Sequence, residues 1–187
     1  LVDTPEVADF AIVAITEPEG GIGYSKADVK AGGNGYLPIS LQYSPYTATY
    51  ARKTSIAGGD PAEKFTNRSY KGKSITVENQ TDLALVKETK AAMGDKPLVV
   101  LLSTTRPVVM EFEPWADAIL VAFGVRSAAY LDIVSGSKEP SGLLPMQFPI
   151  DMKTVEQQFE DTPHDRTPYL DACGNRYDFA VGMNWSG

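Results

Sequence analysis

Three short runs of consecutive apolar residues stand out along the chain, at residues 11–15, 98–102 and 118–123. Unbroken runs of this length are typical of strands that are buried on both faces, in a parallel sheet covered by helices. Polar or glycine-containing sequence follows each run, which indicates that the chain enters a loop there. We therefore predict three strands of a parallel sheet.

Helical patterns occupy the stretches around these runs. One helix is predicted to end at Gly94 and to begin at one of two candidate N-caps, Asn79 or Thr81, so that its apolar residues share one face. A second helix is predicted over residues 127–134, and a short one over residues 111–115.

The alternation of strand and helix over residues 81–136 is the rhythm of βαβ units. It predicts an α/β fold: a mostly parallel open sheet with helices on both faces, a flavodoxin-like three-layer sandwich. We expect residues 1–187 to form one α/β domain that is a piece of a longer chain.

Residues 20–80 break this rhythm. They are rich in Gly, Tyr and polar residues, and only residues 37–43 predict an extended segment. Such a long stretch without a regular pattern is unusual inside a compact domain, so we interpret it as an insertion. Two interpretations stay open. Excursions at the strand ends of α/β proteins often carry sites, whereas a decorative surface loop would have the same composition.

The later part of the chain carries weaker signals. Residues 139–149 have prolines near both ends, which predicts an edge strand or a strap. We assign Trp115 and Trp185 to packing. We expect Glu111 and Glu113 to be carboxylates on a solvated helix face or in a first helical turn, rather than catalysts.

The net charge of the chain bears on whether it binds nucleic acids. Its 17 Lys and Arg residues stand against 24 Asp and Glu residues, a formal net charge of −7. Because nucleic-acid binding needs a basic surplus on one face, we expect no nucleic-acid partner. No basic amphipathic run is present, and no apolar run approaches the roughly 18 residues that span a bilayer, so we expect no membrane association.

Residues suited to cofactors and metals are scarce. Cys173 is the only cysteine and His164 the only histidine, which excludes an internal disulfide and a multi-histidine zinc site. The chain contains neither a glycine-rich nucleotide motif nor a Gly-x-Ser-x-Gly elbow. A catalytic triad would depend on His164, which lies in a polar stretch. We expect no cofactor and no metal.

An ordered series of segments over residues 96–185 resembles a known family. In order, the segments are KPLVVLL at 96–102, RPVV at 106–109, ADAIL at 116–120, EPSGLLP at 139–145 and YDFAVGMNW at 177–185. This order is similar to that of the C-terminal α/β domain of family 3 glycoside hydrolases, a group rich in β-glucosidases. Members of that family carry a Pro-Ser-Gly-x-Leu-Pro strap and a Phe-Gly-x-Gly-Leu-x-Tyr-like tail. Here Ala180 and Val181 replace the usual small and polar residues, and Trp185 replaces the Tyr. Before residue 80 the match is weaker and rests on residues 8–13.

The resemblance implies one half of a retaining exo-β-glycosidase whose site lies between two domains. In this family a preceding (β/α)₈ barrel carries an Asp nucleophile, and a second carboxyl group about 5 Å away acts as acid and base. The implied partner is therefore an N-terminal barrel of the same enzyme, and the implied substrate is a β-glucoside or an oligosaccharide. An inactive isolated chain and a periplasmic or secreted location are also implied.

The family often supplies its acid/base as a Glu from this domain, just after the strand predicted at residues 11–15. Glu17 and Glu19 are the catalytic candidates, and Glu17, nearer to the strand end, is preferred. Aligned on the family's Gly-Glu-Gly-Tyr-Asp-Arg-like element, residues 21–26 place Ile22 where the Glu would stand. Three alternatives follow: a shifted loop brings Glu17 or Glu19 into the role, the acid comes from elsewhere, or this member has lost it.

Sugar-binding residues are expected in the insertion. Tyr24, Asn34, Tyr36 and Arg68 are the candidates, because aromatic faces stack on sugar CH groups and polar side chains bond hydroxyls. Tyrosines that merely anchor a long loop to its own domain would look the same. For the whole protein, the hypothesis that competes with a glycosidase is a non-catalytic module that binds carbohydrate or supports a partner domain.

Overall fold

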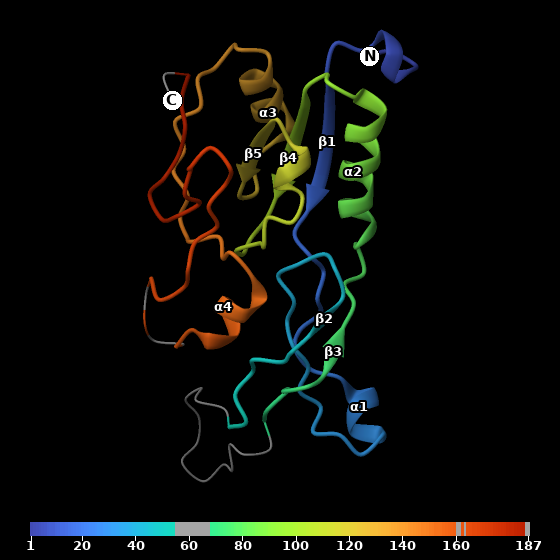
Figure 1. The fold of residues 1–187 in the computed structure, drawn as a ribbon, viewed down its shortest axis with the longest axis vertical. Coiled ribbons are helices and arrows are strands. Elements are labelled where there is room, and N and C mark those ends of the chain that lie inside the picture. The colour runs from blue at the N-terminus through green and yellow to red at the C-terminus, as the bar shows by residue number, and fades with distance from the viewer. Residues whose placement is uncertain (55–67, 160–161, 163, 186–187) are drawn as a thin grey trace.

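A three-stranded parallel sheet forms the centre of the computed structural model, which describes residues 1–54, 68–159, 162 and 164–185 (Figure 1). Its strands are β1 (Ala11–Thr16), β4 (Leu98–Ser103) and β5 (Ala118–Ala122), in the order β1-β4-β5. Both neighbouring pairs are parallel. The predicted α/β class is therefore confirmed, and so are the three strands predicted from the apolar runs.

Helix α2 (Thr81–Met93) covers the face of the sheet that carries the core. Its buried residues are Leu83, Val86 and Met93, and the first two pack in one cluster with alternate residues of β1 and β4. The helix ends at Gly94, whose φ of 60° favours glycine, so the predicted end is confirmed.

Both predicted N-caps of α2 are wrong. The cap residue is Gln80, and its side chain makes no capping hydrogen bond. Asn79 Nδ2 instead donates to Asp82 Oδ2 at 3.1 Å and to the Glu17 carbonyl at 3.0 Å. The Asn79 side chain, which the local pattern predicted to cap the helix, is therefore used in a tertiary contact with the end of β1.

The opposite face of the sheet is more open. Helix α3 (Ser127–Val134) follows β5 where it was predicted, but it buries none of its side chains. On β1, Ile12 is 37% exposed and Ala14 is also exposed. A complete helix layer on this second face stays a prediction.

Three large side chains from outside the sheet complete the core. Tyr43, Phe112 and Phe148 are fully buried, and they come from the insertion, the β4–β5 connection and the strap. The rings of Tyr43 and Phe112 meet edge to face with centroids 6.1 Å apart. In the β4–β5 connection, the short helix predicted at 111–115 is the 3₁₀ turn η3 (Glu113–Trp115). At the other end of the chain, a second 3₁₀ turn, η1 (Pro5–Val7), precedes β1.

The insertion contains little regular structure. It holds helix α1 (Lys26–Lys30) and an antiparallel pair of short strands, β2 (Tyr46–Thr47) and β3 (Ser74–Ile75). The segment 37–43, predicted to be extended, contains no named strand. Part of the predicted insertion, residues 55–67, lies outside the described residues.

The strap at residues 139–149 lies against the C-terminal tail. The Leu144 N–H donates to the Val181 carbonyl at 2.8 Å, one of several backbone bonds that join the two segments. Between them lies helix α4 (Met152–Gln157), which is capped by the Asp151 side chain and was not predicted.

The roles expected for Trp and Glu residues are confirmed in part. Trp115 packs against the core as predicted, whereas Trp185 is 61% exposed, so a packing role for it is wrong. The Glu111 carboxylate accepts the N–H groups of Tyr43 and Ser44. It is therefore a structural acceptor that joins the insertion to the β4–β5 connection, and the expectation of a solvated carboxylate is wrong.

Two leucines on α2 test whether the face that α2 packs against the sheet stabilises the fold. Leu83 is 7% exposed and Leu85 is 47% exposed. We expect Leu83→Ala to lower the free energy of unfolding by about 2–5 kcal/mol, because it removes buried methyl groups and leaves a cavity. Leu85→Ala should change it by about 0.5 kcal/mol or less. Urea unfolding followed by circular dichroism measures both, and equal effects would contradict this account of the packing.

Candidate functional site

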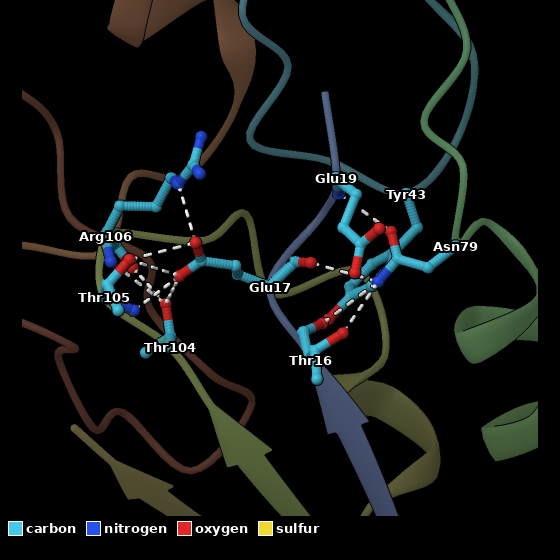
Figure 2. A network of polar contacts seen from close by, with 8 residues as sticks. All are labelled: Thr16, Glu17, Glu19, Tyr43, Asn79, Thr104, Thr105 and Arg106. Carbon is cyan, nitrogen blue, oxygen red and sulfur yellow. Dashed lines mark hydrogen bonds and ion pairs between the residues drawn. The ribbon is translucent and has the colours of Figure 1, made fainter. Parts of the chain in front are cut away.

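Polar side chains gather where β1 and β4 end (Figure 2). The chain continues from β1 into Glu17 and Glu19, and from β4 into Thr104, Thr105 and Arg106. Because the two strands are parallel, their carboxyl ends lie at the same edge of the sheet. Open α/β sheets bind their ligands outside this edge. It is therefore the candidate site.

The Glu17 carboxylate links the two strand ends. It accepts hydrogen bonds from Thr104 Oγ1 at 2.9 Å, from the N–H of Thr105 and from Thr105 Oγ1 at 3.0 Å. Arg106 Nε donates to Glu17 Oε1 at 2.9 Å. The Glu17 side chain is 16% exposed. Its acceptor positions are therefore largely occupied by donors from the segment that follows β4.

These contacts set the protonation state of Glu17. Partial burial alone would raise its pKa, but the hydrogen bonds from Thr105 and Thr104, together with the charge of Arg106, lower the pKa below its usual value. The carboxylate is therefore ionised at neutral pH. Since a general acid must hold a proton before it can donate it, this environment opposes an acid role for Glu17.

The backbone beyond β1 is held from the opposite side. Asn79 Nδ2 donates to the Glu17 carbonyl at 3.0 Å, and Asn79 Oδ1 accepts the Glu19 N–H at 2.8 Å. The Tyr43 hydroxyl donates to the Thr16 carbonyl at 2.6 Å. Burial raises the pKa of Tyr43, so this hydroxyl keeps its proton. Residues 16–19 are thus fixed between two sets of partners, as Figure 2 shows.

Glu19 occupies the same edge in a different environment. Its side chain is exposed, and its carboxylate makes no hydrogen bond to any other residue that the structure describes. Only its backbone is tied down, by Asn79 and by the Glu78 N–H. Glu19 therefore has a fixed backbone and a carboxylate that is available to a ligand.

Ile22 stands close to these carboxylates in sequence. It is 86% exposed and lies between Gly21 and Gly23, whose φ angles of 72° and 76° are in the left-handed region. An apolar side chain is thus presented to solvent at this position.

The sugar-binding candidates of the insertion mainly contact one another and their own loop. Tyr24 and Tyr36 form an isolated antiparallel bridge, and their rings meet edge to face at 5.9 Å. Asn34 donates to the Ser69 carbonyl at 2.7 Å and accepts a bond from Lys73 Nζ at 2.6 Å. These contacts are those of loop anchors.

The structure does not bring all of the predicted site residues together. Glu17 and Glu19 lie at the carboxyl edge of the sheet, whereas the segment around α1, which contains Tyr24, Asn34 and Tyr36, lies at the far end of the insertion (Figure 1). Arg68 is half-buried in the insertion. Glu17 and Glu19 are therefore separate from Tyr24, Asn34 and Tyr36.

Sequence reasoning missed several members of the cluster around Glu17. Thr104, Thr105, Arg106 and Asn79 all bond to the segment that follows β1. One signal was available, because residues 103–106 form a polar run directly after a buried parallel strand. Nothing comparable marked Asn79 as a partner of Glu17.

The described residues show no feature of a metal site or a membrane span. No group of three or more His, Cys, Asp and Glu side chains among them could hold a metal ion. Likewise, none of their helices combines the length and the apolar character needed to cross a bilayer.

Comparison with known proteins finds one matching family model and several similar proteins. The family model for the glycosyl hydrolase family 3 C-terminal domain matches residues 1–185. β-Glucosidase C of Emericella nidulans is 41% identical over 70 residues, which is 37% of this chain and 11% of that protein. The probable β-glucosidases C of Aspergillus flavus and Aspergillus oryzae are each 40% identical over 70 residues, with the same shares of each chain covered. The matched stretch thus spans about a tenth of these relatives. No solved structure matches.

The lowered pKa of Glu17 predicts how stability changes with pH. A carboxyl group whose pKa is lower in the folded state stabilises the fold above its unfolded pKa, and this contribution is lost as the pH falls through the folded pKa. We expect Glu17→Gln to destabilise the protein by about 1–3 kcal/mol at pH 7, because charge-assisted bonds are lost. The difference from the wild type should shrink below about pH 4.5.

Denaturant unfolding measured from pH 7 to pH 3 tests this prediction. Glu19→Gln is the matched control, because the Glu19 carboxylate lacks these contacts, and it should leave the stability at pH 7 within about 0.5 kcal/mol of the wild type. A Glu17→Gln defect that stays constant down to pH 3 would contradict the assignment.

Proposed function

This chain belongs to the C-terminal domain family of the family 3 glycosyl hydrolases, and from that premise we propose that it forms part of a retaining exo-β-glycosidase that removes terminal β-linked sugars. The match over residues 1–185 carries the proposal. The names of the relatives, β-glucosidases, favour a β-glucoside or a β-linked oligosaccharide as substrate.

The proposed partner is an N-terminal (β/α)₈ barrel of the same enzyme. In a retaining mechanism its Asp attacks the anomeric carbon and forms a glycosyl ester, while a carboxylic acid protonates the departing oxygen. The same carboxylate then accepts a proton from the water that cleaves the ester. An attacking carboxylate on the barrel explains why the chain alone would not turn over substrate.

Two carboxylates of this chain are proposed for the acid/base role, Glu17 and Glu19. The geometry favours Glu19, because its carboxylate is exposed and makes no hydrogen bond to another described residue, so it is open to a substrate held between this domain and a second one. Glu17 would first have to give up the donors of Thr104, Thr105 and Arg106.

A non-catalytic role is the second candidate. It is favoured by Ile22, which stands exposed where the family pattern has a Glu, and by the lowered pKa of Glu17. In this case the domain lines or supports the sugar site, and another part of the protein provides the acid.

Rescue by azide separates these possibilities in the full-length enzyme. With the acid/base removed, water is no longer activated, but azide, which needs no base, can attack the glycosyl ester and restore turnover. We expect Glu19→Gln to lower turnover of substrates with poor leaving groups by about 10²–10⁴-fold. Azide should then accelerate release of dinitrophenol from a dinitrophenyl β-glucoside and give a β-glucosyl azide in place of glucose.

The outcomes are distinct. If only Glu17→Gln gives the azide product, Glu17 is the acid/base despite its contacts. If neither variant gives it and both remain active, the non-catalytic role holds. Turnover of an aryl β-glucoside by the 187-residue chain alone would refute the placement of the nucleophile on another domain.

A further inference from the structure

The backbone of Arg106, a partly buried arginine, is held by several contacts. Its N–H donates to Thr104 Oγ1 at 3.2 Å. The one proton of that hydroxyl is shared between the Arg106 carbonyl, 2.5 Å away, and Glu17 Oε2. Thr104 is 2% exposed, and Val108, two residues after Arg106, is fully buried. Pro107, between Arg106 and Val108, restricts the chain further. The side chain of Arg106 nevertheless remains 38% exposed.

Only part of the Arg106 guanidinium is used within the chain. Nε donates to Glu17 Oε1 at 2.9 Å, and this bond orients the plane of the group. The two terminal nitrogens make no hydrogen bond to any residue that the structure describes. Figure 2 shows the Nε atom of the guanidinium turned toward Glu17. Four N–H donors in a rigid, planar arrangement are thus held ready at the carboxyl edge of the sheet.

The local charge selects the chemical class of ligand. Glu17 already balances the charge of Arg106, Glu19 stands exposed at the same edge, and the whole chain carries a net charge of −7. These surroundings do not favour an anionic ligand. Neutral oxygen acceptors, such as the hydroxyl groups of a sugar, can accept hydrogen bonds from the terminal N–H groups of Arg106. They do not require a net positive charge at the site.

We propose that Arg106 binds two hydroxyl oxygens of the neutral sugar substrate through its terminal nitrogens, and that Glu17 is the positioning residue that orients it. This inference rests on the proposed function, because the carboxyl edge becomes a sugar site only when the second domain faces it. It gives Glu17 a role that agrees with its ionised state: it touches Arg106 and acts through it.

Deoxy substrates measure this contact directly in the full-length enzyme. We expect Arg106→Ala to lower kcat/KM for an aryl β-glucoside by about 10- to 100-fold, the range expected for hydrogen bonds from a charged donor. In the wild type, removing a contacted hydroxyl from the substrate should cause a similar loss. In Arg106→Ala the same deoxy substrate should lose little more, because the two changes remove one interaction.

Three further variants make the test specific. Arg106→Lys keeps the charge and an aliphatic stem but lacks the planar guanidinium, so it should recover only part of the loss in kcat/KM. It is also the control for the case in which Arg106→Ala does not fold. In Glu17→Gln, the deoxy substrates should cause a smaller loss of kcat/KM than in the wild type, because Arg106 is present but no longer held in its orientation. Lys138→Ala, on an exposed residue of the turn after α3, is the control for charge.

The possible results distinguish a failure of this inference from a failure of the proposed function. If every deoxy substrate loses the same factor in the wild type and in Arg106→Ala, the contact does not exist and the inference is overturned. A full-length wild type that hydrolyses no aryl β-glycoside would overturn the proposed function, and this inference with it. If the wild type is active and Arg106→Ala has the same kcat/KM as the wild type, only the inference about Arg106 is overturned.

Discussion

The ionised carboxylate of Glu17 is the constraint on which the candidate site depends. Its donors come from residues 87 to 89 positions further along the chain. A largely buried carboxylate that lacked them would be strongly destabilising. The segments that follow β1 and β4 must therefore lie together whenever the sheet forms. Asn79 and Tyr43 hold the same stretch from the other side, so the edge of the sheet is ordered before any ligand arrives.

The parts of the fold that the sequence predicted are those set by local pattern. Unbroken apolar runs identify β1, β4 and β5 because a strand covered on both sides needs apolar residues at consecutive positions. The end of α2 was likewise marked by Gly94, which accepts a positive φ. Contacts between distant segments carry no such local mark. Asn79 looked like a helix cap until the structure showed its amide bonded to the segment after β1.

The same limit applies to the site. Sequence reasoning found the two acidic residues after β1 because a family resemblance pointed there, and it ranked Glu17 first by proximity to the strand. What separates Glu17 from Glu19 is their surroundings: one carboxylate is surrounded by donors and the other is open to solvent. Asn34 illustrates the same difficulty, since its polar side chain is used to bind Ser69 and Lys73.

The bonding of Asn79 has a consequence for producing the protein. Asn79-Gln80-Thr81 is an Asn-x-Thr sequence, the acceptor pattern for N-linked glycans. The nitrogen to which a glycan would be attached donates to Glu17 and Asp82 in the folded chain. A glycan added during secretion, before folding, would replace one of the two hydrogens on that nitrogen and crowd the space between β1 and α2. A chain glycosylated at Asn79 in a eukaryotic secretory host would thus keep the bond from Glu19 N–H to Oδ1 but could no longer make both donations from Nδ2, whereas a bacterial cytoplasm leaves them intact.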